Sequence, residues 1–431
     1  MYDSYAARRQ HVLQAIHPGV LIVAASSSVL RNGDVAFDYR QDSDFYYLTG
    51  LEEPGSVLVL ASSTEKPFTL FVLPRDPRQE AFDGPRVGIE GAIRDFGADQ
   101  AWPHSELTSQ LRELLKNRSR LFYRLGRNRN LDDTILGAIA DLRSRNRKGA
   151  WWPSEIIDPE LALHEIRLLK SSAEVDRIRR AASITGEAIV AAMGQTRPGQ
   201  HEYEVEALIR ATFRRLGAER AAFEPIVAAG SNATILHYRR NSCVIRPDDL
   251  VLLDVGCEWQ YYAGDITRTF PASGRFTASQ ARLYELVLRA QEAAIDSVRP
   301  GVTLDQVHEA ALRPMTEGLI ELGILAGPVD EALTQKRYQP FFMHRTSHYL
   351  GMDVHDVGRY HHEGTARSLE AGMVITVEPG VYFQENADAP PDCRGIGIRI
   401  EDDVLVTPDG HSVLSAEIPK RLADVELACS R

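Results

Sequence analysis

The sequence has few cysteines, and none of them belongs to a paired motif. Four cysteines occur among 431 residues, and no two of them have the CxxC spacing; they are Cys243, Cys257, Cys393 and Cys429. Neither a thiolate zinc site nor a redox motif of that kind is therefore indicated. This usage favours reduced thiols in a cytosolic protein, because disulfides are rare in that compartment.

Long hydrophobic runs and an excess of positive charge are missing as well. The apolar run from Val20 to Ala25 is too short to span a bilayer, and it follows a polar start without the layout of a signal peptide. The formal net charge is -11, whereas nucleic-acid-binding proteins concentrate Lys and Arg. We expect a cytoplasmic protein that binds neither nucleic acid nor a membrane.

What remains is an ordinary globular composition in a chain long enough for two domains. Hydrophobic residues make up 44% and charged residues 25% of the sequence. The first part reads as an α/β domain, with apolar strand-like runs, one segment of helical spacing and a connection rich in Gly and Pro; these are Gly19–Ala25, Val57–Ala61, Phe68–Leu73, Leu131–Arg143 and Ser144–Pro159. We predict an N-terminal α/β domain over residues 1–167.

The second domain, residues 168–431, opens with a helix and contains a faint repeat. Ser171 and Glu174 have the spacing of a capping box, so a helix should start there. Two helix-like pairs are each joined by Arg-Pro-Gly, at 197–199 and 299–301, and strand-like runs follow each pair. Chance recurrence of the turn is the alternative to a duplicated unit, but the matching order of elements favours a pseudo-twofold domain of α/β (α+β) class.

Two acidic residues stand inside strand-like segments of this second domain. Asp254 lies in an apolar run, and Asp265 follows it in a segment that should pair with the first as a hairpin. If the turn centres on Trp259 and Gln260, the two carboxylates lie directly opposite each other. Facing carboxylates repel unless a proton or a metal lies between them. The alternative is that Asp265 pairs with Arg268 or caps a turn.

Three further segments carry residues that suit metal binding or proton transfer. His344, His348 and His355 lie close together, although surface histidines in a loop are the alternative. The neighbouring pair 361–362 is assigned to the surface. Glu378 ends an apolar strand-like run, and Glu401 shares one face of another with Arg399, where a simple cross-strand ion pair is the alternative.

Together these segments supply four carboxylates and one imidazole. Such oxygen-rich sites suit hard or borderline divalent ions, and two ions about 3.5–4 Å apart can share carboxylates and hold one hydroxide. The sequence contains no HExxH, so the helical zinc-protease arrangement is absent.

The ordered set Asp254, Asp265, His348, Glu378, Glu401 resembles the ligand order of the pita-bread metallopeptidases. Within that family the chain is most similar to aminopeptidase P over nearly its whole length. The similarity lies in 39–45 and 47–50 of the first domain and in 235–238, 262–271 and 395–403 of the second. The resemblance implies a pseudo-symmetric catalytic domain, and creatinase, which shares the shape, lacks these ligands.

The resemblance also implies roles for the site residues. Asp265 and Glu401 would bridge two metals, Asp254 would bind one, and His348 and Glu378 the other. A metal-bridging hydroxide would attack the carbonyl before proline, with Glu378 as proton carrier and His355 beside one metal at the oxyanion. Mn²⁺ is preferred, with Co²⁺, Fe²⁺ and Zn²⁺ as alternatives.

Other residues are assigned to orientation or to the substrate. His237, His344 and Arg399 are expected to hold ligands or substrate, with a purely structural role as the alternative. Tyr382 is a candidate neighbour of the proline ring, with core packing as its alternative. Asp34 and Phe82 are candidates to approach the site of a neighbouring subunit.

The family usually has Gly after the first histidine of its His-Gly-x-Ser-His motif, whereas this chain has Arg345, which puts substrate preference in question. We therefore expect an Xaa-Pro aminopeptidase that acts on peptides with proline second and forms a homo-oligomer, a dimer or tetramer. The alternatives are a prolidase, which cleaves only Xaa-Pro dipeptides, and a non-catalytic peptide-binding paralogue.

Overall fold

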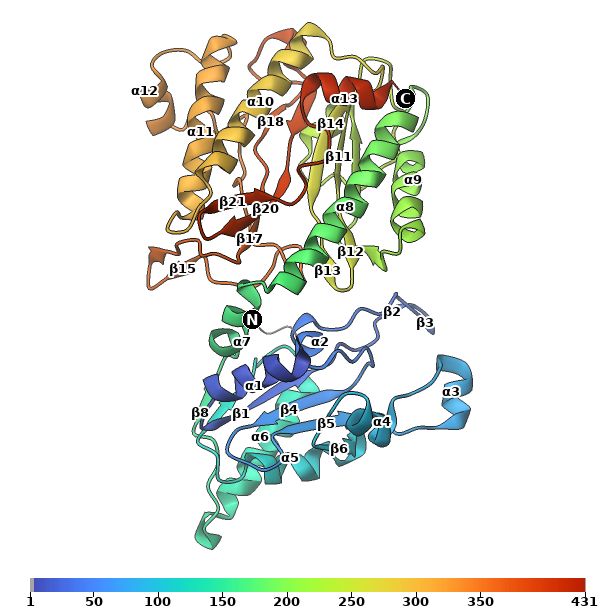
Figure 1. Cartoon of the computed structure of the whole chain (residues 1–431), viewed down its shortest axis with the longest axis vertical. Helices are drawn as coiled ribbons and strands as arrows, with labels where there is room; N and C mark the ends of the chain where they lie inside the picture. The colour runs from blue at the N-terminus through green and yellow to red at the C-terminus, as the bar shows by residue number, and fades with distance from the viewer. Residues whose placement is uncertain (1–3, 431) are drawn as a thin grey trace. The chain divides into compact units, whose positions relative to one another are not determined.

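The computed structural model describes residues 4–430 and divides the chain into two compact units, one ending at Ile166 and the other beginning at Arg167 (Figure 1). Each unit has its own buried apolar core. No helix in the described residues is long and apolar enough to cross a membrane. All four cysteines are free thiols.

The N-terminal unit is built on a six-stranded mixed sheet with the order β6-β5-β4-β1-β7-β8. Its strands are β1 (Gly19–Ala24), β4 (Val57–Ala61), β5 (Phe68–Val72), β6 (Gln100–Pro103), β7 (Arg120–Phe122) and β8 (Glu155–Ile157), and β2 (Leu30–Asn32) and β3 (Val35–Ala36) form a separate hairpin. The helices are α1 (Tyr5–Ala15), α2 (Ser43–Thr49), α3 (Pro77–Asp83), α4 (Gly88–Arg94), α5 (Leu107–Leu115), α6 (Arg129–Ser144) and α7 (Glu160–Leu168), the last of which runs across the division between the units.

Burial explains why these segments adopt the predicted structure. Every residue of β4 and β5 is buried, as continuous apolar runs require. Helix α6 buries Leu131, Ile135, Ala138 and Leu142, which share one face. The stretch 144–159, predicted as a plain connection, also contains β8, whose three residues are mostly exposed and show no apolar alternation.

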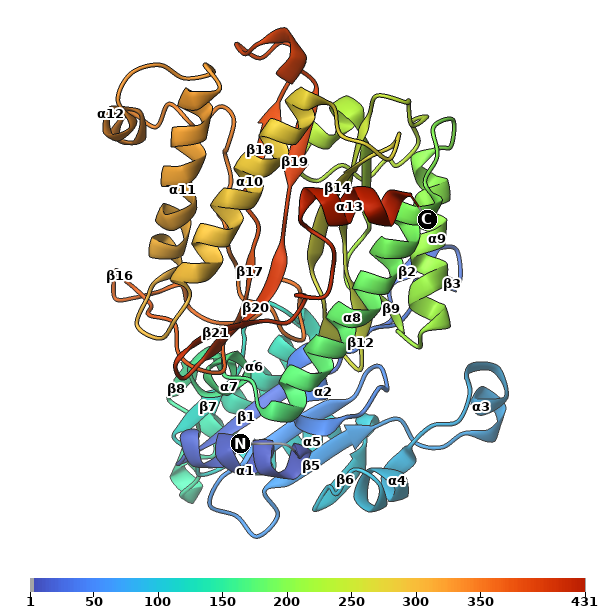
Figure 2. The same ribbon diagram turned by 45° about the horizontal axis from the view of Figure 1, so that its top comes forward.

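Over the described residues 167–430 the C-terminal unit contains the α-helices α8 to α13 and several small sheets (Figure 2). The helices are α8 (Ser172–Gln195), α9 (Glu202–Arg215), α10 (Ala278–Ser297), α11 (Leu304–Glu321), α12 (Val329–Thr334) and α13 (Leu422–Cys429). The strands are β9 (Arg220–Ala221), β10 (Ile226–Ala229), β11 (Leu250–Val255), β12 (Cys257–Trp259), β13 (Tyr262–Ala263), β14 (Ile266–Pro271), β15 (His361–His362), β16 (Thr365–Ala366), β17 (Val374–Val377), β18 (Gly380–Phe383), β19 (Ile396–Arg399), β20 (Asp402–Thr407) and β21 (Gly410–Val413). The strand orders are β10-β11-β14, β13-β12-β9 and β17-β20-β21, with two-stranded β18-β19 and β15-β16.

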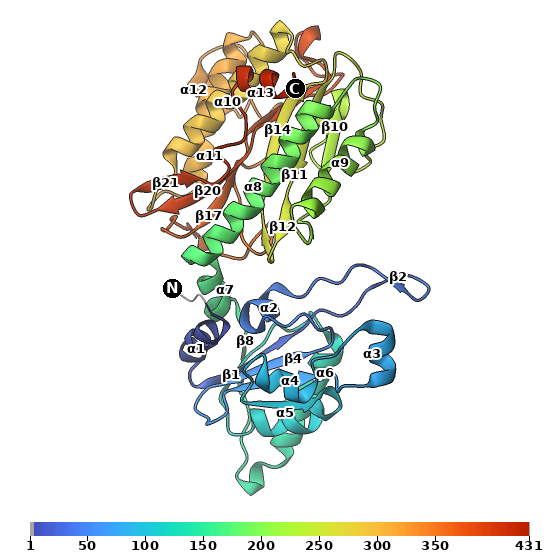
Figure 3. The same cartoon turned by 45° about the vertical axis from the view of Figure 1, so that its right-hand side comes forward.

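The predicted capping box and repeat are present in this unit. The Ser171 hydroxyl accepts a hydrogen bond from the Glu174 amide, and the Glu174 carboxylate accepts one from the Ser171 amide, so α8 begins where predicted. The two Arg-Pro-Gly turns separate α8 from α9 and α10 from α11, and they place Gly199 and Gly301 at φ of 95° and 87°. Those angles favour glycine. Helix α8 runs along the strands β12 and β14 (Figure 3).

The hairpin of β11–β14 forms, but its register differs from the prediction. The turn lies at Gln260 and Tyr261, whose φ angles are 49° and 69°, as a type I′ turn requires. Asp254 therefore pairs with Thr267 and not with Asp265. Because side chains alternate along a strand, Asp265 and Thr267 project from the same face, and Asp254 and Asp265 are diagonal neighbours on it.

Candidate metal centre and peptide-binding cavity

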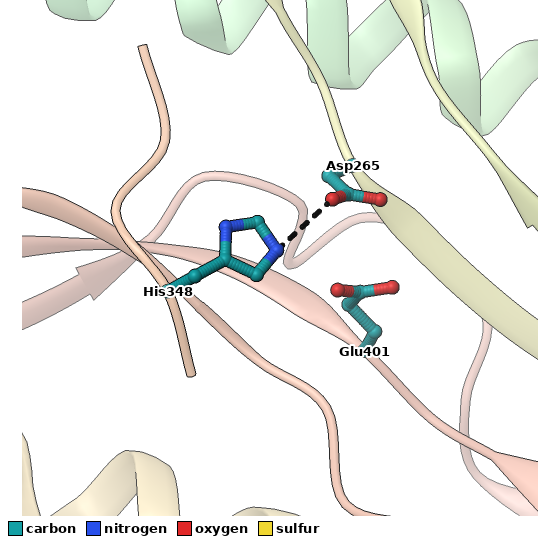
Figure 4. A group of neighbouring side chains, drawn as sticks. All are labelled: Asp265, His348 and Glu401. Carbon is teal, nitrogen blue, oxygen red and sulfur yellow. Dashed lines mark ion pairs between the residues drawn. The ribbon is translucent and has the colours of Figure 1, made fainter. Parts of the chain in front are cut away.

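Side chains from five separate segments converge in the C-terminal unit. Asp254 stands near the end of β11, Asp265 immediately before β14, His348 in the loop after α12, Glu378 directly after β17, and Glu401 between β19 and β20. Asp265, His348 and Glu401 each offer an atom that lies within 4.8 Å of the others (Figure 4). Their side chains come from different strands and a loop and point toward one another.

The remaining two carboxylates complete this group. The Oε1 atom of Glu378 lies 3.7 Å from Nε2 of His348, and the same nitrogen lies 3.4 Å from Oδ2 of Asp265. Asp254 and Glu378 line a cavity of about 460 Å³ together with His348. All five residues that were predicted as metal ligands therefore lie around one cavity.

The electrostatics of the group require a compensating charge. Burial raises the pKa of Asp265 to about 6, against the opposing hydrogen bond from His348, and raises the pKa of Glu378 to about 7. Burial, with the charges of Asp265 and Glu378, raises the pKa of Glu401 well above its ordinary value. Buried carboxylates this close repel each other unless protons or cations intervene. Four carboxylates and one imidazole form a donor set that fits divalent cations.

His348 is oriented for ligation by its other ring nitrogen. Its Nδ1–H donates to the carbonyl oxygen of Tyr349 at 3.0 Å, which leaves Nε2 directed at the carboxylates. Burial acts against a charged ring, but the hydrogen bond and charge of Asp265, with the charge of Glu378, raise the pKa of His348 to about 9. A cation at this position would take the place of that proton.

A chain of hydrogen bonds runs beside the carboxylates. Arg399 donates from Nη2 to Asp254 Oδ2 at 2.5 Å and from Nη1 to the Tyr382 hydroxyl at 2.8 Å. The Tyr382 hydroxyl lies 2.9 Å from Nε2 of His344, whose Nδ1–H donates to the carbonyl oxygen of Arg345 at 2.8 Å. Burial, reinforced by the charge of Arg399, lowers the pKa of His344 to about 3. His344 is therefore neutral and accepts the hydrogen bond of Tyr382.

The structure places the remaining candidates at different distances from the cluster. Tyr382 is fully buried, so its contact with His344 and Arg399 runs through its hydroxyl. The rings of His355 and His348 meet edge to face at 4.5 Å, and His237 lines the same cavity. Asp34 lies in the turn between β2 and β3, and Phe82, in α3, is 86% exposed. Both belong to the N-terminal unit and lie outside the group that the structure assembles.

Two models of known families match the chain in succession. The model of the aminopeptidase P N-terminal domain matches residues 5–123, and that of metallopeptidase family M24 matches residues 176–408. The Xaa-Pro aminopeptidase of Escherichia coli strain K12 is 42% identical over 427 residues, which cover 98% of this chain and 97% of that protein. The chain belongs to metallopeptidase family M24.

Solved structures of M24 relatives have the same fold throughout. The aminopeptidase PepP of Pseudomonas aeruginosa is 45% identical with a TM-score of 0.97, and the match covers 99% of this chain and 97% of that one. A zinc-substituted aminopeptidase P of E. coli in complex with product is 41% identical with a TM-score of 0.96, covering 100% and 98%. The predicted family and the predicted pita-bread fold class are confirmed.

The sequence did not reveal the residues that hold this M24 site in place. Thr267, opposite Asp254 in the hairpin, donates its hydroxyl to Glu401 Oε2 at 2.7 Å and accepts from Arg399 Nε at 3.2 Å. Arg268 is fully buried and pairs at 2.7 Å with Asp402. The alternative prediction, in which Arg268 pairs with Asp265, is therefore wrong. Thr267 and Arg268 both lie in the segment 262–271, which carries part of the family resemblance. That position was the one sequence signal that could have indicated their supporting role.

Proposed function

We propose that this M24 metallopeptidase is an Xaa-Pro aminopeptidase that works with two divalent cations. The observation that carries the proposal is the convergence of Asp254, Asp265, His348, Glu378 and Glu401 beside an accessible cavity. The M24 relatives include proteins named Xaa-Pro aminopeptidase that match over nearly their whole length. The cytoplasmic location expected from the cysteine usage remains part of this proposal.

These five side chains would hold the cation pair, with Mn²⁺ preferred for an oxygen-rich donor set and Co²⁺, Fe²⁺ or Zn²⁺ as alternatives. When bound, the pair would supply a water that is ionised near neutral pH and would polarise the scissile carbonyl. Arg399, which lines the same cavity, is already paired with Asp254 and so does not supply that charge.

Glu378 is the group that would carry the proton. In the metal-free protein burial raises its pKa to about 7. A carboxylate placed beside the reacting water can accept a proton and return it. Proline nitrogen must leave as a secondary amine and therefore needs that proton. The scissile bond is a tertiary amide without an N–H, so the site must recognise the substrate by other groups.

Histidines and the arginine chain would orient the substrate. His355 and His237 line the cavity beside His348 and are the candidates for contacts with the carbonyl oxygen and the peptide. Tyr382 and Arg399 would act through His344 and Asp254, which they fix by hydrogen bonds. Each of these four assignments is tested by kinetics of the single variants.

A peptide panel with metal-stripped protein tests the function. We expect cleavage of Ala-Pro-Ala after the first residue, restored by individual ions and most strongly by Mn²⁺. Cleavage of the dipeptide Ala-Pro alone would instead identify a prolidase. A protein that binds peptides and hydrolyses none of them with any ion would be a non-catalytic paralogue.

The N-terminal unit, which we take as the domain of residues 1–167, would control access and mediate homo-oligomer contacts. Asp34 and Phe82 are exposed there, so a second subunit could contact them. Light scattering should give a dimer or tetramer. If Phe82→Ala changes neither the mass nor the KM for peptides, its assignment is wrong.

A further inference from the structure

Arg345 presents a cation to the cavity beside the metal centre. Arg345 lines the cavity of about 460 Å³, here called the arginine cavity, which Arg399 also lines. Its backbone carbonyl accepts the Nδ1–H of His344, so the side chain starts from a fixed point. The side chain is 62% exposed, so a molecule from solution can contact it.

An adjoining cavity of about 280 Å³, here called the carboxylate cavity, has the opposite character. The two cavities share five residues, which are the acids Asp254 and Glu378 and the histidines His237, His348 and His355. Beyond the shared residues, the carboxylate cavity is lined by three acids and one arginine, which are Glu224, Asp265, Glu401 and Arg239. The unshared charged residues of the arginine cavity are both cations.

This difference orients a peptide across the metal centre. The free ammonium group belongs to the first residue of the peptide, whose carbonyl carbon forms the scissile bond. The cations of the arginine cavity would repel this ammonium group. Phe223, Ile226 and Val354 give the carboxylate cavity apolar walls that suit the first side chain. On these grounds the segment after proline would lie in the arginine cavity.

Arg345 is also the cation that can exchange its partner there. Arg399 is buried and engaged with Asp254 and Tyr382. Arg345 pairs with Asp305 in the first turn of α11, whose side chain is 41% exposed. Exposed ion pairs of this kind are weak, so a substrate carboxylate can compete with Asp305.

We propose that Arg345 selects peptides that carry a carboxylate beyond the proline. The carboxylate belongs either to an acidic third residue or to the C-terminus of a short peptide. The inference rests on the proposed function and deepens it by naming the substrate class. Arg345 acts on specificity, and bond cleavage itself remains with the metal centre.

Four peptides separate the two sources of the carboxylate. Ala-Pro-Glu-amide has only the side-chain acid, Ala-Pro-Gln has only the terminal acid, Ala-Pro-Gln-amide has neither, and Ala-Pro-Lys-amide has the opposite charge. Wild-type kcat/KM should be about five-fold higher for an acid than for Ala-Pro-Gln-amide, as expected for an exposed pair. This ratio of kcat/KM values should fall to about one in Arg345→Gln. In the wild-type protein the ratio should become smaller at high salt.

Two further variants guard against indirect effects. Asp305→Asn releases Arg345 and should raise the ratio, a result that a merely disturbed fold would not give. Arg313→Gln is the matched control. Arg313 lies in α11, as Asp305 does, and forms an exposed ion pair with Asp330. This variant should leave the ratio and the rates as in wild type.

The outcomes are decisive in each direction. A ratio above one for either acid, lost in Arg345→Gln, supports the proposal and identifies which carboxylate is recognised. Equal rates for all four peptides, or a ratio that Arg345→Gln leaves unchanged, overturn the charge selection while the proposed function stands. Absence of cleavage of every peptide overturns the proposed function and this inference with it.

Discussion

Replacement of Asp402 by Asn tests how the fold supports the metal centre. The Asp402 carboxylate is fully buried and accepts four hydrogen bonds of 2.7 Å. Its donors are Arg268, Gln291, Ser415 and Lys420. Arg268 in turn donates to the carbonyl oxygen of Glu401 at 2.6 Å, so this network fixes the backbone of a proposed metal ligand.

The magnitude follows from what Asn cannot do. In Asn an NH₂ group replaces one carboxylate oxygen and faces the two donors that this oxygen accepted from. About two charge-assisted hydrogen bonds of about 1.5–3 kcal/mol each are therefore lost. The substitution also leaves the fully buried guanidinium of Arg268 without its anion. Breaking a buried ion pair from one side costs about 3–5 kcal/mol, and we expect a loss in the free energy of unfolding within that range.

Urea unfolding of the C-terminal unit measures the loss. Trp259 is the single tryptophan of that unit, and the other three are Trp102, Trp151 and Trp152. With these three replaced by Phe, fluorescence follows the C-terminal unit alone. For a slope of about 3 kcal/mol/M, the midpoint of the metal-free Asp402→Asn variant should fall by about 1 M or more.

The matched control is Asp330→Asn, because Asp330 is 81% exposed in its pair with Arg313. That variant should stay within about 0.5 kcal/mol of wild type. An Asp402→Asn variant equally close to wild type would refute the reasoning that the buried network stabilises this unit.

The difference in the free energy of unfolding between wild type and Asp402→Asn depends on pH in a definite direction. Burial alone would raise the pKa of Asp402, but the charges of Arg268 and Lys420 hold it far below its ordinary value. A depressed carboxyl pKa contributes stability that is complete above the unfolded pKa of about 3.9 and is lost as the pH falls through the folded pKa. The difference in the free energy of unfolding between wild type and Asp402→Asn should therefore become smaller below about pH 4.

Three further predictions concern the site itself. Glu378→Gln should lower kcat by about 10²–10⁴ with an unchanged circular dichroism spectrum, because the proton carrier is removed; wild-type turnover would contradict its role. Tyr382→Phe removes two hydrogen bonds, one from Arg399 to the hydroxyl and one from the hydroxyl to His344. We expect kcat/KM to fall by about tenfold, or about 1.4 kcal/mol, which lies within the range for two bonds of about 0.5–1.5 kcal/mol each; unchanged kinetics would show that these bonds are dispensable. In the metal-free protein the pKa of His348 is about 9, so cation binding at pH 7.5 should release protons and strengthen as the pH rises, and calorimetry in two buffers that finds no release would oppose ligation by His348.

The sequence allowed the candidate site to be predicted because its signal is local. A carboxylate inside an apolar strand, as at Asp254, has no inexpensive structural explanation, so each such position indicates a partner. The antiparallel pairing of β17 with β20, in which Val377 lies opposite Asp402, brings Glu378 and Glu401 to the same cluster. Spacing alone did not place them together; the resemblance to a metallopeptidase family did.

The hairpin register could not be predicted from the turn residues. Gln260 and Tyr261 both adopt positive φ, although neither is a residue that favours this conformation. The predicted centre of the turn was therefore one residue too early. The error changes the partner of Asp254 to Thr267 but keeps Asp265 on the same face, because the correction shifts the pairing by two residues.

The consecutive acids Glu401, Asp402 and Asp403 show where sequence reasoning stops. Side chains alternate between the two faces of an extended segment. Glu401 accordingly accepts from Thr267 at the metal centre, Asp402 turns to Arg268 on the other side, and Asp403 returns to accept the amide N–H of Asp265 at 3.3 Å. Alternation predicts that the three acids divide between two environments. The identity of each environment depends on partners more than a hundred residues away, and only the folded chain supplies them.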